Sequence, residues 1–211
     1  YPDYRTSLEI IQSCAEAGAD LMELGMPFSD PLADGPTIQN STQVALENGM
    51  DTKKCLHAVS DLRKRGITIP LMLMGYYNPV LAYGEERFVE KAAESGANGF
   101  IIPDLPPEEG ASFEDHCRHN ELALSYLLAP TSTEARMKLV SKRASGFVYL
   151  VSLTGVTGAR LELPTYLQDF VTLVRRHVTH PLAIGFGIST PEQAQEVGKL
   201  VEGVIVGSKL I

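Results

Sequence analysis

The chemically most unusual segment of the 211-residue sequence runs from Glu23 to Gln39 and reads Glu-Leu-Gly-Met-Pro-Phe-Ser-Asp-Pro-Leu-Ala-Asp-Gly-Pro-Thr-Ile-Gln. Glu23 lies in a short apolar run, where period-two alternation points it the same way as Leu21, into an apolar interior. Burial there raises the pKa of a carboxyl group, which suits a group that gives and takes protons near neutral pH. The segment therefore predicts an acid/base catalyst, and the alternative for Glu23 is a structural ion pair.

The same segment holds two further carboxylates, Asp30 and Asp34. Asp30 precedes a proline and Asp34 precedes a glycine, and both pairs are also common in ordinary turns. Each aspartate is thus a candidate for chemistry with a plain structural alternative.

Glycine and hydroxyl residues gather after three later apolar runs, in Tyr149–Gly158, Gly185–Ser189 and Gly207-Ser208. Glycine lets backbone N–H groups approach an anion, hydroxyl groups add donors, and a following helix N-terminus adds a favourable dipole. Because three such loops follow one another, we predict a phosphate site there. Tyr149, which shares strand parity with Val151, is expected to close one wall of it.

Composition excludes several classes of protein. The formal net charge is −8 and no Lys/Arg block occurs, so we expect neither a nucleic-acid nor a membrane partner. Three widely spaced cysteines match neither a disulfide framework nor a metal site and favour a reducing compartment. His116 and His119 have metal-ligand spacing in a predicted outer helix but lack a third ligand, so we predict no metal.

The elements that must position these residues alternate between short apolar runs and helical patterns. The predicted strands cover residues 21–24, 70–74, 99–102, 122–128, 147–152, 182–185 and 203–206. The predicted helices cover residues 7–17, 38–48, 52–65, 85–94, 107–118, 133–143, 163–177 and 191–199. Three helix-to-strand junctions share a small-residue phrase in which Gly18, Gly96 or Gly203 is expected to close the helix in a left-handed cap.

Strict alternation in one domain spanning residues 1–211 allows an open doubly wound α/β sheet or a closed (β/α)₈ barrel, the TIM barrel. No Gly-x-Gly-x-x-Gly opens a helix after an early strand, so the barrel is favoured. The sequence starts within a predicted first helix and stops after a predicted last strand. We therefore expect a barrel trimmed of its first strand and terminal helices.

The segment from Glu23 to Gln39 closely resembles the signature of the tryptophan synthase α subunit family. The resemblance continues, in family order, through Met74-Gly-Tyr-Tyr-Asn-Pro79, Pro103-Asp-Leu-Pro106, Gly155-Val-Thr-Gly158 and Gly185-Phe-Gly-Ile-Ser189. It covers essentially the whole chain. It implies a carbon–carbon lyase of tryptophan biosynthesis that splits indole-3-glycerol phosphate into indole and glyceraldehyde 3-phosphate by a retro-aldol step.

The resemblance also implies roles for single residues. Glu23 matches the glutamate that protonates the indole ring carbon and accepts the glycerol hydroxyl proton, and Asp34 matches the aspartate that stabilises charge at the indole nitrogen. The residues matching the substrate pocket are Tyr76, Tyr149, Thr157, Gly158 and Phe186. The residues matching the phosphate grip are Gly158, Gly185, Gly187, Gly207 and Ser208.

Members of the family pair with a pyridoxal-phosphate β subunit, which implies an α2β2 heterotetramer and no cofactor on this chain. Asp30, Asn78 and Pro79 resemble contacts with that partner. The implied location is the cytoplasm, or a plastid in a plant. One departure is Leu153, where some members carry arginine in the closing loop.

Three other readings stay open at this point. The chain could be a standalone lyase that releases free indole, or a weakly catalytic module that binds and activates a β subunit. A sugar-phosphate isomerase or epimerase could use the same phosphate-binding barrel, because a fold does not determine a function.

Overall fold

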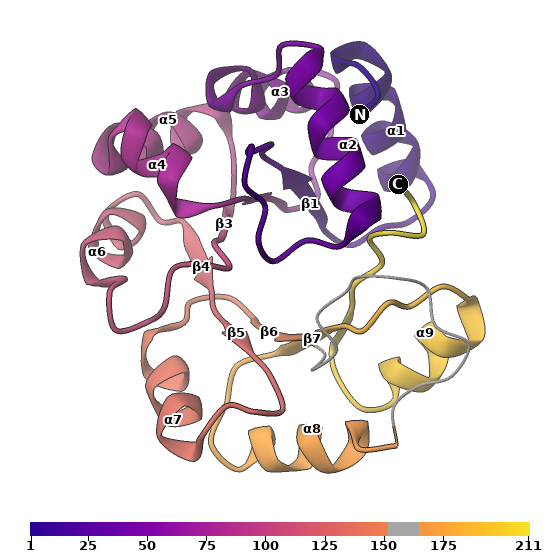
Figure 1. Cartoon of the computed structure of the whole chain (residues 1–211), viewed down its shortest axis with the longest axis vertical. Coiled ribbons are helices and arrows are strands. Elements are labelled where there is room, and N and C mark those ends of the chain that lie inside the picture. Colours follow the sequence, from indigo (N-terminus) through magenta and orange to yellow (C-terminus); the bar gives the residue numbers. More distant parts are fainter. Residues whose placement is uncertain (152–164) are drawn as a thin grey trace. The chain divides into compact units, whose positions relative to one another are not determined.

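Strands and helices alternate along residues 1–151 and 165–211, which are the residues that this computed structural model describes (Figure 1). The earlier elements are α1 (Tyr4–Glu16), β1 (Met22–Gly25), α2 (Pro36–Glu47), α3 (Thr52–Lys64), β2 (Leu71–Met74), α4 (Tyr77–Tyr83), α5 (Glu85–Ser95), β3 (Gly99–Ile101), α6 (Ala111–His119) and β4 (Ala123–Ser125). The later elements are β5 (Leu127–Leu128), α7 (Glu134–Arg143), β6 (Val148–Val151), α8 (Leu167–Arg175), β7 (Leu182–Gly185), α9 (Pro191–Gly198) and β8 (Gly203–Val204). The predicted alternation is confirmed.

The described strands form two four-stranded sheets, in the orders β1-β2-β3-β4 and β5-β6-β7-β8. The pairs β1–β2 and β2–β3 are parallel, and Glu23 lies opposite Met72. The pairs β5–β6, β6–β7 and β7–β8 are parallel as well, and Tyr149 lies opposite Ala183. Parallel neighbours joined through helices are the arrangement that the short, non-alternating apolar runs predicted.

The described chain groups into two compact units. The first contains residues 1–32 and 39–124, and the second contains residues 33–38 and 125–211. The first unit therefore carries Glu23, while the second carries Asp34 and Tyr149. The expectation of one domain over residues 1–211 stays a prediction.

Two predicted elements differ from the structure. The single strand expected over residues 122–128 is wrong, because the run divides into β4, which pairs with β3, and β5, which pairs with β6. Tyr126 between them accepts a backbone hydrogen bond from Tyr149. Helix α4 was not predicted at all; it begins within Tyr-Tyr-Asn-Pro, and proline is tolerated in the first turn of a helix, where its missing N–H costs no bond.

Capping residues explain where several helices begin. Asp3, Asp51 and Thr133 accept hydrogen bonds from backbone N–H groups three residues on, at 3.0, 2.7 and 3.2 Å. Thr190 forms a capping box with Gln193 at the start of α9. These side chains satisfy N–H groups that have no partner inside the helix. The sequence predicts two of these starts, because Thr131-Ser-Thr-Glu134 and Ser189-Thr-Pro-Glu192 carry cap chemistry, and both are confirmed.

The glycines at the three helix-to-strand junctions differ from one another. Gly18 and Gly96 have φ values of +98° and +91°, which is the left-handed region, as expected. Gly203 lies in β8 without a positive φ, so the expectation of a left-handed cap there is wrong. A Cβ on Gly203 would lie 2.9 Å from the Cβ of Ala183. Close approach of β7 is thus the reason for this glycine.

The core of the first unit packs helices against one face of its sheet. Phe100 on β3 is fully buried, with its ring centroid 5.2 Å from those of Phe88 on α5 and Phe113 on α6. Figure 1 shows both helices beside β3. Residues neighbouring Phe100 in the strand must therefore point to the opposite face.

At the start of the strands, a polar cluster connects the first unit's loops. The guanidinium of Arg63 donates to the backbone oxygens of Gly96, Ile67 and Ile69 and to the side chain of Asn98. Asn98 in turn accepts the backbone N–H of Leu71 at 2.9 Å. Because these groups lie at the amino ends of β2 and β3, they stabilise the fold at the end away from the predicted site.

Candidate active site

Glu23 lies in the middle of β1 on the face away from the helices. Its register partner is Met72 on β2, whose own partner is Gly99 on β3. Residues in register on parallel strands share a face, and Gly99 is next in sequence to Phe100, which faces the helices. The predicted orientation of Glu23, away from the helices, is therefore confirmed. Its neighbour on the same face, Met72, is apolar.

Within residues 1–151 and 165–211, the Glu23 carboxyl group has no ion-pair partner. Its Oε1 atom is buried and, among the residues that the structure describes, has no hydrogen-bond partner. Burial raises the pKa of Glu23 from 4.5 to about 7. Near neutral pH this group is therefore present in both protonation states, as a proton shuttle requires.

Ser125, the last residue of β4, is a buried polar residue that the sequence reasoning missed. It is 1% exposed, and its hydroxyl has no partner among the described residues. Ser125 belongs to the second unit. The available signal was a serine within a predicted strand.

Asp34 lies in the loop between β1 and α2, two residues before the helix begins. It is half-buried, and its neighbour Gly35 is buried. A carboxylate at this position lies near the positive end of the helix dipole. Asp34 therefore lies at the entry to α2.

In the second unit, Tyr149 and Gly185 come together. Both lie on one face of the sheet, since Tyr149 pairs with Ala183, two residues before Gly185. A Cβ on Gly185 would lie 2.5 Å from the Tyr149 hydroxyl oxygen and 2.8 Å from its ring. Gly185 is thus required to make room for the Tyr149 phenol, a reason that the sequence alone did not provide.

Phe186 and Tyr166 form an aromatic pair next to Gly185. Phe186 is 2% exposed, and its ring centroid lies 6.4 Å from that of Tyr166. The hydroxyl group of Tyr166 is buried and has no partner within residues 1–151 and 165–211. The sequence reasoning missed Tyr166, because a tyrosine just before a helix carries no motif.

The predicted phosphate loops start from adjacent strands. Gly187 follows β7 with a φ of +73°, and Gly207 and Ser208 follow β8. Ile205 donates to the Ile184 carbonyl at 2.8 Å, which extends the β7–β8 pairing toward these loops. Two glycine-containing loops therefore leave the same end of neighbouring strands. Thr157 and Gly158, which were also predicted to contact substrate, lie outside the described residues.

The pocket residue predicted after β2 packs against the loop after β1. Tyr76 is 5% exposed, and its ring centroid lies 5.6 Å from that of Phe28. The predicted partner contacts are more open: Asp30 and Asn78 are exposed, and Pro79 is half-buried. This part of the first unit thus has a buried aromatic side and an exposed side.

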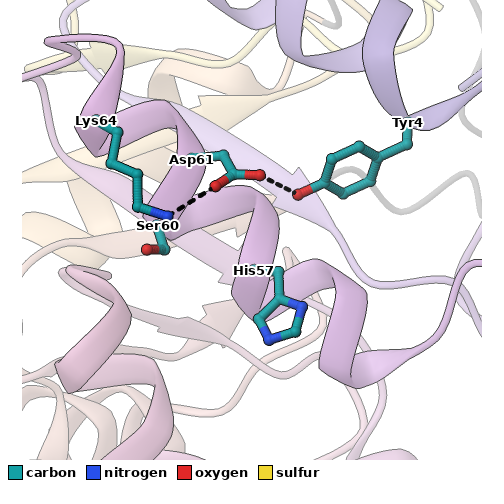
Figure 2. Close-up of a pocket in the computed structure, with 5 residues that line it drawn as sticks. All are labelled: Tyr4, His57, Ser60, Asp61 and Lys64. Atoms are coloured by element: carbon teal, nitrogen blue, oxygen red, sulfur yellow. Dashed lines mark hydrogen bonds and ion pairs between the residues drawn. The ribbon is translucent and has the colours of Figure 1, made fainter.

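A surface hollow between α1 and α3 contains none of the predicted site residues (Figure 2). Its lining residues are Tyr4, His57, Ser60, Asp61 and Lys64. The Asp61 carboxylate accepts hydrogen bonds from the Tyr4 hydroxyl at 2.9 Å and from Lys64 at 3.1 Å, and these bonds lower the pKa of Asp61. We attribute these contacts to packing between the two helices.

The described part of the chain contains neither a metal-binding cluster nor a membrane-spanning helix. No group of three or more His, Cys, Asp or Glu residues in it could hold a metal ion. No helix in it is both long and apolar enough to cross a membrane.

Comparison with known proteins identifies the family. A sequence model described as "Tryptophan synthase alpha chain" matches residues 1–211. The tryptophan synthase alpha chain of Dehalococcoides mccartyi is 52% identical over 211 residues, which cover 100% of this chain and 82% of that protein. Tryptophan synthase of Saccharomyces cerevisiae is 48% identical over 212 residues, covering 100% of this chain and 30% of that longer protein.

Solved structures show the same likeness in three dimensions. A structure of Mycobacterium tuberculosis tryptophan synthase matches with a TM-score of 0.93 and 36% identity, covering 99% of this chain and 79% of that one. The alpha subunit from Legionella pneumophila matches with a TM-score of 0.90 and 38% identity, covering 97% and 76%. The fold class is therefore α/β, the (β/α)₈ barrel, as predicted. By sequence and by structure, the chain belongs to the tryptophan synthase alpha chain family.

Proposed function

We propose that Glu23 and Asp34 perform the reaction of this family in this chain. That reaction is the alpha reaction of tryptophan biosynthesis, and the chain is a carbon–carbon lyase that cleaves indole-3-glycerol phosphate. The observation that carries the assignment is the buried Oε1 atom of Glu23, which has no partner among the described residues, together with a pKa of about 7. A structural ion pair would have a partner and a lowered pKa.

Glu23 acts in both directions during the proposed cleavage. Its protonated form gives a proton to the indole ring carbon that bears the side chain, which turns the ring into an electron sink. The resulting carboxylate takes the proton of the adjacent glycerol hydroxyl while the carbon–carbon bond breaks. The electron pair of the broken carbon–carbon bond returns to the ring, which becomes indole. The carbon that bore the hydroxyl group becomes the aldehyde carbon of glyceraldehyde 3-phosphate. Glu23 ends protonated, as it began.

Asp34 stabilises the positive charge that develops at the indole nitrogen when the ring carbon is protonated. A fixed carboxylate that accepts the indole N–H stabilises this charge without any rearrangement of solvent. Its half-buried place at the entry to α2 suits this role, because a carboxylate that is partly removed from water stabilises a nearby positive charge more strongly.

The remaining pocket residues hold the substrate. Tyr76, Tyr149 and Phe186 are buried aromatic residues that suit a flat indole ring. The phosphate group binds the glycine loops, with the proposed donors Gly158, Gly185, Gly187, Gly207 and Ser208. Support for this placement comes from the adjacent strands β7 and β8, since barrel enzymes frequently bind phosphate in the loops after their last two strands.

The partner of the chain is the beta subunit, which carries the pyridoxal phosphate of tryptophan synthase. We place the contact at Asp30, Asn78 and Pro79, in an α2β2 heterotetramer. Two exposed apolar side chains, each two residues from a predicted contact in the sequence, support the placement: Leu32 is 93% exposed and Leu81 is 53% exposed. Exposed apolar residues on a loop and a neighbouring helix are typical of a protein interface.

We place the enzyme in the cytoplasm, or in a plastid if the source is a plant. Cys14, Cys55 and Cys117 are all free thiols. Unpaired cysteines, two of them buried, suit a reducing compartment.

Release of indole from indole-3-glycerol phosphate, with and without a tryptophan synthase beta subunit, tests the proposal. We expect Glu23→Gln to abolish cleavage while the folded variant still binds substrate. A Glu23→Gln protein that keeps most of its turnover would refute the assignment. Stimulation by the beta subunit is expected, whereas equal turnover without it would indicate a standalone lyase. Folded protein that binds the beta subunit but releases no indole would indicate a binding module.

A further inference from the structure

Tyr77, at the start of α4, is held by a carboxylate from another loop. Its backbone N–H donates to Oδ1 of Asp104, in the segment after β3, at 2.9 Å. The residue at the N-cap position, Tyr76, makes no side-chain capping bond. Asp104 therefore replaces the local capping side chain. It accepts the backbone N–H at the start of α4, although it lies 27 residues further along the chain. A seven-residue helix needs such support, because short helices are unstable on their own.

The side chain of Tyr77 is held as well. Its hydroxyl group donates to Glu85 at the start of α5, and Ser112 on α6 donates to the other oxygen of Glu85 at 3.1 Å. The Tyr77 ring packs edge-on against Phe113, with centroids 6.0 Å apart. Burial and the Glu85 carboxylate raise the pKa of Tyr77, so the phenol keeps the proton that it donates. Tyr77 is thus fixed at its backbone and at its hydroxyl.

Fixing Tyr77 also fixes its neighbour Tyr76. The Tyr76 ring lies against Phe28, which is five residues after Glu23 in the loop between β1 and α2. A Cβ on Gly75 would lie 2.8 Å from the Met26 Cε atom, so the two loops also meet closely at this glycine. The contacts therefore run from Asp104 through the Tyr77 backbone to Tyr76 and on to the loop that follows Glu23.

We propose that Asp104 is a positioning residue for substrate binding: by holding the Tyr77 N–H, it sets Tyr76 against Phe28 in the wall of the substrate pocket. The inference rests on the proposed role of Tyr76 in that pocket. Asp104 is exposed and touches Tyr77 rather than the reacting atoms. Its loss should therefore weaken binding of the substrate in the ground state and in the transition state alike, which raises KM and leaves kcat nearly unchanged.

The test compares variants in the complex with the beta subunit, by steady-state indole release. We expect Asp104→Ala to raise KM about fivefold, the equivalent of one net hydrogen bond, with kcat within about twofold. Asp104→Asn keeps an oxygen that can accept the Tyr77 N–H, so its KM should stay near that of the parent. The matched control is Asp115→Ala on α6, which removes an exposed aspartate bonded to Arg118. Its KM should not change.

Further comparisons distinguish a wrong role for Tyr76 from a wrong role for Asp104. Tyr76→Ala tests the pocket itself: if its KM is unchanged, the proposed role of Tyr76 fails and the inference fails with it. If Tyr76→Ala raises KM but folded Asp104→Ala does not, only the positioning role is refuted. Equal impairment of Asp104→Asn and Asp104→Ala would also refute it. Should Asp104→Ala not fold, Asp104→Ser takes its place, because its shorter side chain does not reach the Tyr77 N–H, and an unchanged KM in that variant overturns the proposal.

Discussion

Replacing Glu23 by glutamine should stabilise the fold, and the gain should depend on pH. Glutamine has nearly the same shape but cannot ionise. Burial raises the pKa of Glu23 in the folded state from 4.5 to about 7. Because the folded-state pKa lies above the unfolded-state value, the folded protein binds the proton more tightly. Stability is therefore lost as the pH rises from about 4.5, and the loss is complete above about 7.

The difference between the two pKa values corresponds to a decrease of about 3 kcal/mol in the free energy of unfolding when Glu23 ionises. The free energy of unfolding of Glu23→Gln should therefore differ little from that of the parent near pH 5. At about pH 8.5 the variant should be more stable by about 3 kcal/mol. The change with pH is the proper measure, because the buried amide of glutamine has its own cost at every pH. The same variant should release no indole at either pH, so that stability and activity change in opposite directions.

Urea unfolding of the parent and the variant at the two pH values measures this difference. Glu90→Gln is the matched control: Glu90 is exposed on α5, so the same chemical change should have no pH-dependent effect. A stability difference for Glu23→Gln that stays constant between the two pH values would refute the reasoning. It would mean that the carboxyl group is solvated or paired, and the proton shuttle would lose its physical basis.

Three other predictions concern the same site. Because Glu23 must first donate a proton, kcat/KM should fall about tenfold per pH unit above about 7, and a pH–rate profile that stays flat to about pH 9 would contradict this role. Asp34→Asn should lower kcat by about 10²-fold while the protein stays folded, as single-turnover kinetics and circular dichroism would show. Gly185→Ala should lower the free energy of unfolding in urea by about 1–3 kcal/mol, because its Cβ would overlap the Tyr149 phenol. Tyr149→Phe removes the closest oxygen, so the double variant should recover part of the loss.

Local patterns in the sequence were sufficient for most of the elements. Short apolar runs bounded by glycine predicted β1 and β7 within one residue, and capping chemistry predicted the start of α9. These features depend on residues close together in the chain, so propensity and periodicity can determine them. The orientation of Glu23 belongs to this group, because strand alternation is a local property. The long motif around Glu23 was specific enough to indicate the family.

Contacts between distant residues were decided only by the tertiary structure. The sequence did not show that the run 122–128 would divide between two neighbouring strands, since pairing depends on which strands lie beside it. Gly203 was expected to be a helix cap, but close approach of β7 is the reason for it, and the need for a glycine at Gly185 to make room for the Tyr149 phenol likewise appeared only in the structure. The bond between Asp104 and Tyr77 joins residues 27 positions apart.

The chemistry of Glu23 shows the same division. Its residue type and strand parity follow from the sequence, and both indicate a carboxyl group over an apolar surface. Whether a cation lies within reach of that carboxyl depends on the side chains that other strands bring to the same face. Only the packed structure shows that Oε1 is buried without a partner among the described residues, and this absence of a partner is why burial can raise the pKa.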